Sequence, residues 1–379
     1  MSRLAGILPK LALLIASIVL FYGLLEGAAR VVWRSENHGG HCASPDPVLI
    51  NANTPSCEFR DKKTEGTLVE FRFNQFAYRD SVLVADTSRA PLELFAVGDS
   101  FTLGAMVPFE STYVQVAQAD LRKALGEPVR YVNGGVSSWD LSQYLVRVRE
   151  AAGRGADVIT VGVLANDFFA DLSEAGLRER AALGGKASME DAYSELYMAR
   201  RPWIERLYRA VLSESRALDL AVHLVMSSDD AYAVAYLWRE GPESYLRRPL
   251  PPAWADKLAN GERILREMAE AARAANAKLV VIAIPQRIQV LLHSRAERYP
   301  ELDAHALLDE LGRICRALGI AYIDGFAPLS EVERPTALYY PVDGHLTPEG
   351  QERLGHYVAA ELLRLGLVSA PDASAAARR

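Results

Sequence analysis

Five short apolar runs, separated by segments with helical periodicity, constrain the fold of this chain more than any other feature. The runs have the sequences LELFAV, VRYVN, DVITVGVL, KLVVIAIP and AYID, and the first begins at Leu92. Between them apolar residues recur at helical spacing, as at Leu141, Tyr144, Leu145 and Val148. Strands that alternate with helices build βαβ units. The sequence therefore predicts an α/β fold in which helices cover both faces of a mostly parallel sheet.

The first 33 residues have a different character. Residues 11–25 (LALLIASIVLFYGLL) carry no charge, and with the apolar residues on either side they approach the roughly 20 residues that cross a bilayer. Arg3 and Lys10 precede this stretch, so the short N-terminal tail is expected in the cytoplasm. The sequence predicts a single N-terminal transmembrane helix that anchors the remaining chain in the periplasm or otherwise outside the cytoplasmic membrane.

Two alternatives for this segment remain open. Gly27, Ala28 and Ala29 resemble the small-residue site at which a signal peptide is cleaved. A helix buried in the core of a domain would also be apolar, although no other stretch of the chain is as apolar. The apolar run that resumes at Val31, with Trp33 at the depth of the membrane interface, favours an uncleaved anchor.

Composition divides the rest of the chain into three parts. Residues 34–90 are rich in Pro, Asn and charged residues, with one strand candidate at residues 67–73, and form a lead-in. Residues 91–368 carry the alternating pattern and form the main domain. Within it, residues 168–260 are too long for an ordinary crossover, so we expect a helical insertion there. Residues 369–379 lack apolar periodicity and are expected to be disordered.

Charge and cysteine content narrow the functional classes. The 379 residues include 48 acidic and 42 basic side chains, a net charge of −6, which argues against a nucleic-acid partner. An oxidising compartment would let Cys42 and Cys57, both in the lead-in, form a disulfide. Cys315 falls in a helical pattern and is expected to be a buried free thiol. No pair of Cys or His residues has the spacing of metal ligands, so no metal site is predicted.

The loop after the first apolar run contains Gly98, Asp99 and Ser100. Ligands of open α/β sheets bind beyond the carboxyl ends of the strands. A tight turn there would expose the Ser100 hydroxyl, and nearby amides would stabilise an oxyanion. A Gly-Asp-Ser turn without a chemical role is the alternative. The chain lacks the Lys of a phosphate-binding loop and the G-x-G-x-x-G of a dinucleotide site.

Two further loops follow the second and third runs. In the first, Asn133 precedes Gly134 and Gly135, and adjacent glycines let a backbone amide approach a ligand closely. In the second, Asn166 precedes Asp167, and an amide side chain at a strand end is able to donate to an oxyanion. A plain turn or a helix cap explains either loop equally well when it is taken alone.

The fourth segment lies near the C-terminus. Thr347 followed by Pro348 marks a helix start, so His345 falls in the loop before the last helix. Asp343 is two residues away, close enough to orient the imidazole of a general base. A solvated loop histidine is the alternative.

Together, these blocks resemble the SGNH or GDSL hydrolase superfamily, whose fold is a three-layer α/β/α sandwich. The resemblance covers roughly residues 92–167 and 278–366, and residues 74–80 (NQFAYRD) resemble the segment before the first block in membrane-anchored bacterial members. It implies a catalytic Ser100 as nucleophile and His345 as base, with Asp343 as the orienting carboxylate. It also implies an oxyanion hole formed by the Ser100 amide, the Gly135 amide and the Asn166 side chain.

The chain departs from the pattern of the superfamily at two places. Leu164 and Ala165 stand before Asn166, where the third block usually has a glycine, so that loop is expected to have a different shape. The last block is Asp-Gly-His instead of the more frequent Asp-x-x-His, which leaves Asp324, after the run AYID, as an alternative partner for His345.

The resemblance implies a serine esterase that acts through an acyl-serine intermediate and needs no cofactor. For an exported and anchored member, we expect O-acyl groups of a cell-envelope or extracellular carbohydrate, with O-acetyl groups foremost and the envelope polysaccharide machinery as a partner. An O-acetyltransferase and a non-catalytic carbohydrate-binding or assembly protein are the alternatives. Gln286 and Arg287, after the run KLVVIAIP, are predicted to contact substrate. Aromatic residues of the insertion suit either a sugar groove or helix packing.

Overall fold

A computed structural model describes residues 2–168 and 215–369 of the chain, without the side chains of residues 2–8. Five parallel strands form the central sheet in the order β10-β9-β8-β6-β7. The strands are β6 (Leu92–Val97), β7 (Val129–Asn133), β8 (Val158–Val163), β9 (Lys278–Ala283) and β10 (Ala321–Asp324). All five coincide with the apolar runs, so the predicted α/β fold is confirmed.

Burial explains why these strands read as continuous apolar runs. Every residue of β8 (VITVGV) is buried, as expected for an inner strand of a parallel sheet that is covered on both faces. β7 lies beside one edge of β6, and the next strand in the chain, β8, lies beside the opposite edge of β6. The carboxyl ends of β7, β6 and β8 therefore lie side by side at the point where the direction of winding reverses, which is where such sheets bind ligands.

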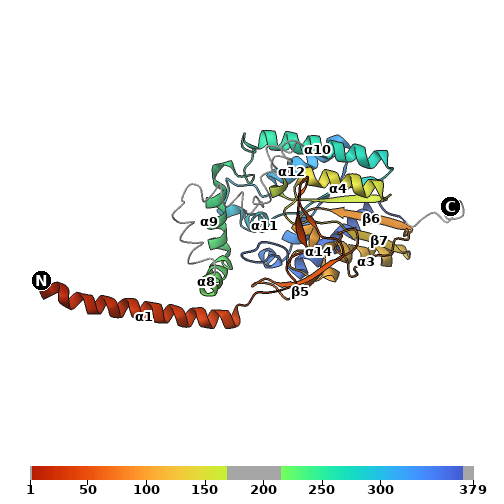
Figure 1. The fold of residues 1–379 in the computed structure, drawn as a ribbon. Helices are drawn as coiled ribbons and strands as arrows, with labels where there is room; N and C mark the ends of the chain where they lie inside the picture. Colours follow the sequence, from red (N-terminus) through yellow and green to blue (C-terminus); the bar gives the residue numbers. More distant parts are fainter. Residues whose placement is uncertain (1, 169–214, 370–379) are drawn as a thin grey trace.

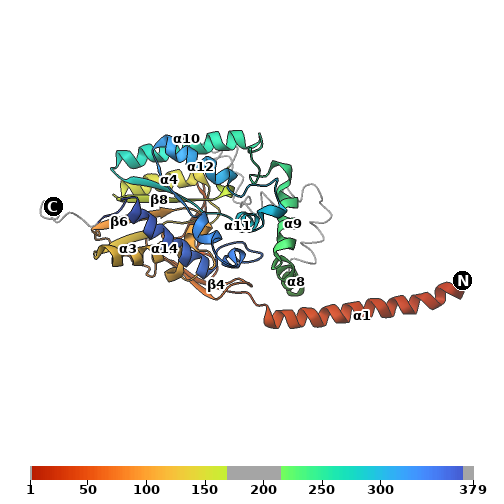
Figure 2. The ribbon, with the colours of Figure 1, turned by 180° about the vertical axis from the view of Figure 1, so that it is seen from behind.

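Helices form a layer on each face of the sheet (Figures 1 and 2). One layer contains α3 (Tyr113–Leu125) and α14 (Pro348–Arg364), which pack together. The other contains α4 (Leu141–Gly153), α10 (Trp254–Ala274) and α12 (Ala306–Leu318). Local signals set the starts: Asp140 and Gln143 form a capping box for α4, and Thr347 caps α14 with Pro348 at its first position.

Short elements connect the strands to these layers at the carboxyl edge. They are α2 (Ser100–Leu103) and the 3-10 turn η1 (Phe109–Ser111) after β6, the turn η2 (Ala165–Asp167) after β8, α11 (Arg287–Ser294) and the turn η5 (Ala296–Arg298) after β9, and α13 (Phe326–Ser330) and the turn η6 (Pro335–Leu338) after β10. The first element after each of these strands begins within four residues of the strand end, so the strand ends fix where these loops start.

The lead-in is more regular than its composition indicated. Besides β5 (Val69–Phe73), which lies within the predicted strand, it contains β1 (Glu36–His38), β2 (Ala43–Asp46), β3 (Ile50–Asn53) and β4 (Cys57–Lys62). Strands β1, β4 and β5 form an antiparallel sheet, and β2 pairs with β3. The Arg79 amide then donates to the Asn133 carbonyl at the end of β7. The lead-in thereby covers part of the free edge of the central sheet.

The N-terminal segment forms one helix, α1 (Ser2–Val32), which extends away from the domain in Figure 1. Its stretch Pro9–Val32 has a mean hydropathy of 2.1, and none of its most apolar part is buried in the domain, so it is not a core helix. A membrane anchor and a signal sequence both fit these properties.

The insertion is described from residue 215 onward and contains α8 (Arg216–Met226), α9 (Asp229–Glu240) and the turn η4 (Gly241–Glu243) before α10. Residues 169–214 of the predicted insertion and residues 370–379 of the predicted tail lie outside the described residues. The N-terminus of α8 contacts the end of α1, where the Glu26 carboxylate accepts from the amides of Arg216 and Ala217, each at 3.0 Å. The insertion thus contacts α1 through hydrogen bonds at the start of α8.

Candidate active site

Ser100 lies at the carboxyl end of β6, on the turn that begins α2. Asp99 caps this helix, because its carboxylate accepts from the Phe101 amide at 2.9 Å. Gly98 keeps the turn tight, since a Cβ at this position would lie 2.1 Å from Thr102 Oγ1. The sequence of the turn therefore presents Ser100 at the edge of the sheet that the strand pattern indicated.

His345 lies in the loop between η6 and α14. The Tyr340 amide donates to the His345 carbonyl at 2.9 Å, which closes the loop. Gly344 has a φ of 82°, a left-handed conformation that favours glycine. The resulting turn brings the Asp343 carboxylate back to His345, whose amide lies 3.3 Å from Asp343 Oδ1. The short Asp-Gly-His spacing is therefore compatible with a local pair.

Ser100, His345 and Asp343 form a continuous hydrogen-bonded relay. His345 Nε2 lies 2.7 Å from Ser100 Oγ, and His345 Nδ1 bonds to Asp343 Oδ1. Because a carboxylate only accepts, Nδ1 carries the proton and Nε2 accepts from the Ser100 hydroxyl. Burial acts to raise the pKa of Asp343, but the hydrogen bond and charge of His345 hold it below its ordinary value. This geometry suits a serine nucleophile with a general base and an orienting carboxylate.

Asp324, the alternative partner, occupies a different place. It ends β10, and its Oδ1 accepts from the Phe326 amide at 2.9 Å. Burial raises the pKa of Asp324, and the neighbouring charge that opposes this shift belongs to His305. The structure therefore pairs His345 with Asp343 and makes Asp324 part of the turn that leads into α13.

Asn166 lies in the turn η2 after β8, beside the nucleophile. Burial raises the pKa of Asp99, and the nearby Asn166 side chain is one of the groups that oppose this rise. The adjacent Asp167 is buried and accepts from the Leu164 amide at 2.7 Å and from the Tyr144 hydroxyl at 3.0 Å. Burial, and then the charge of Asp99, raise the pKa of Asp167. Asp167 thus shapes the loop that lacks the usual glycine, and the half-buried Asn166 faces the Ser100 turn.

The oxyanion role of Gly135 stays a prediction, and the structure shows two other contacts of this residue. The Gly135 amide donates to Asn133 Oδ1 at 3.1 Å, so it serves its own loop. A Cβ at Gly135 would lie 2.3 Å from the Leu103 nitrogen, which explains the glycine by close packing against α2. Further along the loop, Ser138 is exposed and has a φ of 64°, an uncommon conformation for a residue with a side chain.

The two predicted substrate contacts bond to the protein instead. The Arg287 side chain is 3% exposed, and its guanidinium donates to the Pro341 carbonyl at 2.5 Å and the Met226 carbonyl at 3.0 Å. Gln286 Nε2 donates to Asn166 Oδ1 at 3.2 Å. Both residues therefore lie at the active edge of the sheet, as expected, but they connect elements of the chain.

Glu65 is a supporting residue that sequence reasoning missed. Its carboxylate accepts from the amides of Val342 at 3.0 Å and Asp343 at 2.8 Å. It also lies 2.5 Å from His223 Nδ1 of α8, and its side chain is only 6% exposed. The lead-in thereby holds the loop of Asp343. Nothing in the surrounding residues DKKTEG distinguishes Glu65 from an acidic residue of a solvated turn.

Arg79 supports the nucleophile from the other side and belongs to the segment NQFAYRD. It is fully buried, which lowers its pKa to about 9. Its guanidinium donates to the carbonyls of Leu103, Gly104 and Val107, the last at 2.6 Å, at and beyond the end of α2. The segment therefore acts structurally: it fixes the helix that begins with Ser100.

The three cysteines adopt the states that the sequence predicted. Cys42 and Cys57 form a disulfide across the lead-in. Cys315 is a buried free thiol in α12, and burial raises its pKa to about 12. Such a thiol is protonated and unreactive at neutral pH.

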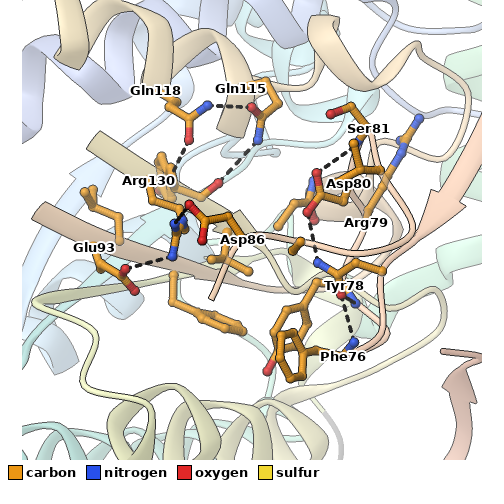
Figure 3. Close-up of a pocket in the computed structure, with 18 of the residues that line it drawn as sticks. Phe76, Tyr78, Arg79, Asp80, Ser81, Asp86, Glu93, Gln115, Gln118 and Arg130 are labelled. Carbon is orange, nitrogen blue, oxygen red and sulfur yellow. Dashed lines mark hydrogen bonds and ion pairs between the residues drawn. The ribbon is translucent and has the colours of Figure 1, made fainter. Parts of the chain in front are cut away.

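A pocket of about 490 Å³ lies apart from this site, between the lead-in and strands β6 and β7 (Figure 3). Arg130 lies between Glu93, at 3.0 Å, and Asp86, at 3.7 Å. Gln118 donates to Gln115 at 2.8 Å. These polar groups pair with one another, and Ser100, Asp343 and His345 are not among the lining residues. The pocket therefore marks where the lead-in covers the edge of the sheet.

The parallel sheet, the serine at the end of its first strand and the Ser-His-Asp relay together define a serine hydrolase of the α/β/α type. The model of the GDSL-like Lipase/Acylhydrolase family matches residues 96–353. The chain belongs to this family. No curated protein matches the sequence.

Several solved structures are similar to the chain at low identity. A structure of TesA is 16% identical with a TM-score of 0.39, covering 72% of this chain and 99% of that chain. An acetylxylan esterase from Geobacillus stearothermophilus is 13% identical with a TM-score of 0.39, covering 73% and 96% of the two chains. A lipase/acylhydrolase from Enterococcus faecalis is 12% identical with a TM-score of 0.38, covering 72% and 95%.

Proposed function

We propose that this protein is a serine esterase that removes O-acyl groups, with O-acetyl groups foremost, from a carbohydrate of the cell envelope or extracellular space. The observation that carries the proposal is the relay from Ser100 Oγ through His345 to Asp343, with the side chain of Asn166 beside it. Such a relay activates a hydroxyl for acyl transfer.

The proposed reaction has two steps. Ser100 Oγ attacks the ester carbonyl while its proton passes to His345 Nε2, and the oxyanion accepts hydrogen bonds from the Asn166 side chain and the Ser100 amide. The C–O bond to the sugar then breaks, and the sugar oxygen takes the proton from His345. In the second step, water loses a proton to His345 and attacks the acyl-serine. The bond to Ser100 Oγ then breaks, Ser100 Oγ takes the proton back from His345, and the carboxylic acid is released. Asp343 keeps the imidazole oriented throughout.

The exposure of the relay supports a polymeric and polar substrate. The side chains of His345 and Asp343 are 21% and 30% exposed, so an ester on a large carbohydrate reaches them without entering a closed cavity. The aromatic residues of the insertion give less support for a sugar groove. Tyr245 and Trp254 are buried, whereas Tyr193, Tyr197, Trp203 and Tyr208 lie outside the described residues.

The proposed location rests on α1. We infer that Pro9–Val32 anchors the chain in the cytoplasmic membrane, with Arg3 and Lys10 on the cytoplasmic side and the catalytic domain on the other side. An envelope polysaccharide would then lie within reach of Ser100, and the envelope polysaccharide machinery would be the partner.

The deciding experiment incubates the full-length chain, purified in detergent, with acetylated xylan and measures free acetate. We expect Ser100-dependent release of acetate, with the Ser100→Ala protein as the control. Transfer of the acetyl group to an added unacetylated oligosaccharide, without free acetate, would favour the O-acetyltransferase. Absence of both products with this polymer and with p-nitrophenyl acetate would contradict the catalytic assignment and favour a binding protein.

A further inference from the structure

The side chain of Asn166 is able to serve an oxyanion only if its NH₂ group, and not its carbonyl, points toward the Ser100 turn. A chain of hydrogen bonds from the insertion reaches this side chain. We propose that Gln286 is a positioning residue that, together with Tyr236 and Tyr245, holds the Asn166 amide in the orientation the reaction needs. The inference rests on the proposed esterase function and extends it to three residues that do not touch the reacting atoms.

Gln286 lies between two hydroxyl groups and one amide. Its Oε1 accepts from the Tyr236 hydroxyl at 2.7 Å and from the Tyr245 hydroxyl at 2.9 Å. Its Nε2 donates to Asn166 Oδ1 at 3.2 Å. Both polar ends of the Gln286 side chain are therefore engaged by partners of opposite hydrogen-bonding character.

The direction of these bonds follows from the contact between Gln286 and Asn166. Asn166 Oδ1 accepts from Gln286 Nε2 at 3.2 Å, so the NH₂ group of Asn166 points away from Gln286, toward Asp99 and the Ser100 turn. Reversal of the Gln286 amide would place two carbonyl oxygens against each other. Donation therefore runs in one direction, from the tyrosines through Gln286 to Asn166 and Asp99.

Packing keeps the two tyrosine hydroxyls in place as donors. Tyr245 is 3% exposed, and its ring centroid lies 5.8 Å from that of Trp254. The Tyr236 ring lies 5.8 Å from that of Tyr232 on the preceding turn of α9. Burial raises the pKa of both Tyr236 and Tyr245, so both hydroxyls keep their protons at neutral pH.

The insertion provides the two tyrosines of this chain of hydrogen bonds. Tyr236 lies in α9, and Tyr245 follows the turn η4, so both belong to the insertion after β8. Gln286 is the residue just before α11, which follows β9, and Asn166 follows β8. The insertion therefore acts on the oxyanion donor through one side chain, beyond any part it has in substrate binding.

The first test changes the hydrogen-bonding character of residue 286 at nearly constant shape. In Gln286→Glu a carboxylate faces Asn166 Oδ1, so the Asn166 amide turns its NH₂ group toward residue 286 and away from the oxyanion. We expect kcat for p-nitrophenyl acetate to fall about 10- to 100-fold, with KM within about twofold, because the lost interaction forms in the transition state. The matched control is Tyr232→Phe, which removes a hydroxyl from the same helix; its kcat should stay within about twofold of the wild-type value.

The second test removes the donors at the other end of the chain. Tyr236→Phe or Tyr245→Phe leaves one hydroxyl on Gln286 Oε1, so each should lower kcat less than the double variant does. These variants keep both rings and their packing, and the melting temperature verifies that they fold. If the double variant folds and keeps the wild-type kcat, the inference is overturned.

The third test asks whether Gln286 acts through Asn166. In the Asn166→Ala background, Gln286→Glu should lower kcat by less than about twofold, because the group that it positions is gone. Fully additive losses would overturn the inference while leaving the esterase assignment intact. If the wild-type protein shows no Ser100-dependent ester hydrolysis, the proposed function itself fails and the inference fails with it.

Discussion

The two sides of the catalytic relay are supported in different ways. Ser100 follows an inner strand of the sheet, and backbone hydrogen bonds hold its turn, including one from the Val136 amide to the Gly98 carbonyl at 3.0 Å. Asp343 and His345 lie on a loop beyond the sheet. The Glu65 carboxylate, which comes from the lead-in, accepts from two amides of this loop. The turn of the nucleophile thus directly follows a strand of the central sheet and has Arg79 as an added support, whereas the loop of the base lies beyond the sheet and is held by the Glu65 side chain.

The largest expected effect lies on the nucleophile side. Ser100→Ala should lower ester hydrolysis by a factor of about 10⁴ or more, because no other group forms the acyl intermediate. Since the Ser100 turn is held by the backbone, the melting temperature should stay close to the wild-type value. The rate with p-nitrophenyl acetate and a thermal melt measure the two quantities. His345→Ala should be similarly severe, and the double variant should be no worse than either single one. A substantial residual rate in Ser100→Ala would exclude Ser100 as the nucleophile.

The second prediction concerns Asp343 and Asp324, the two carboxylates that the sequence left as alternative partners of His345. Asp343→Asn should lower kcat by about 10²- to 10⁴-fold, because an amide neither fixes the required tautomer nor stabilises the imidazolium. Asp324→Asn should change kcat by less than about twofold, since Asp324 bonds to the Phe326 amide in another loop. Steady-state kinetics of both proteins at pH 7 decide between them. Equal losses in the two variants would contradict the pairing seen in the structure.

The pH dependence tests the same pair without a mutation. His345 holds the pKa of Asp343 below its ordinary value, which is about 3.9 in an unstructured chain. Asp343 therefore stays ionised above about pH 5, so the carboxylate of the relay does not contribute to a loss of activity between pH 7 and 5, which leaves the imidazole as the group of the relay that would. We expect log(kcat/KM) to fall with a limiting slope of about 1 per pH unit on the acid side. A limiting slope of 2 would show that a second group in the relay titrates.

The sequence allowed the reactive residues on both sides of the relay to be predicted better than the residues that support them. The strands, Ser100 and Asn166 were predictable, because a buried parallel strand reads as a continuous apolar run and the reactive residues follow it directly. Asp343 and His345 were predictable because two residues suffice to form a pair. The positions of these residues in the fold follow from short stretches of sequence, because each residue lies next to the strand or the partner that positions it.

The residues that support the reactive groups, Glu65 and Gln286, could not be predicted in the same way. Glu65 meets Asp343 across 278 positions of the chain, and Gln286 meets Tyr236 across 50. No local sequence pattern predicts these two contacts, because they depend on how the lead-in and the insertion pack against the folded main domain. Gly135 is a different case: close packing against Leu103 is a second reason for a glycine at this position, and the role of its amide in an oxyanion hole stays a prediction.

The third mutational effect tests the support of the base directly. Glu65→Gln should lower kcat by about 5- to 50-fold, because a neutral amide accepts more weakly from the Val342 and Asp343 amides, and charge-assisted bonds are roughly twice as strong as neutral ones. Glu58→Gln, an exposed position in β4 of the same lead-in, is the matched control and should leave kcat unchanged. Glu65→Asp should restore part of the rate. An unchanged rate in a folded Glu65→Gln protein would show that the loop holds its shape alone.

The smallest expected effect on activity is that of the disulfide, which lies on the lead-in and bonds to neither side of the relay. Replacing both Cys42 and Cys57 by serine opens a loop whose ends are 15 residues apart, which should lower the free energy of unfolding by about 3 kcal/mol. The rate at 25 °C should change by less than about twofold, because Glu65 still reaches its amides through the paired strands β4 and β5. Thiol labelling of the denatured wild-type protein should detect one thiol, Cys315, before reduction and three after it. Three thiols before reduction would exclude the bond, and a large loss of activity in the double variant would show that the lead-in positions the base only while it is cross-linked.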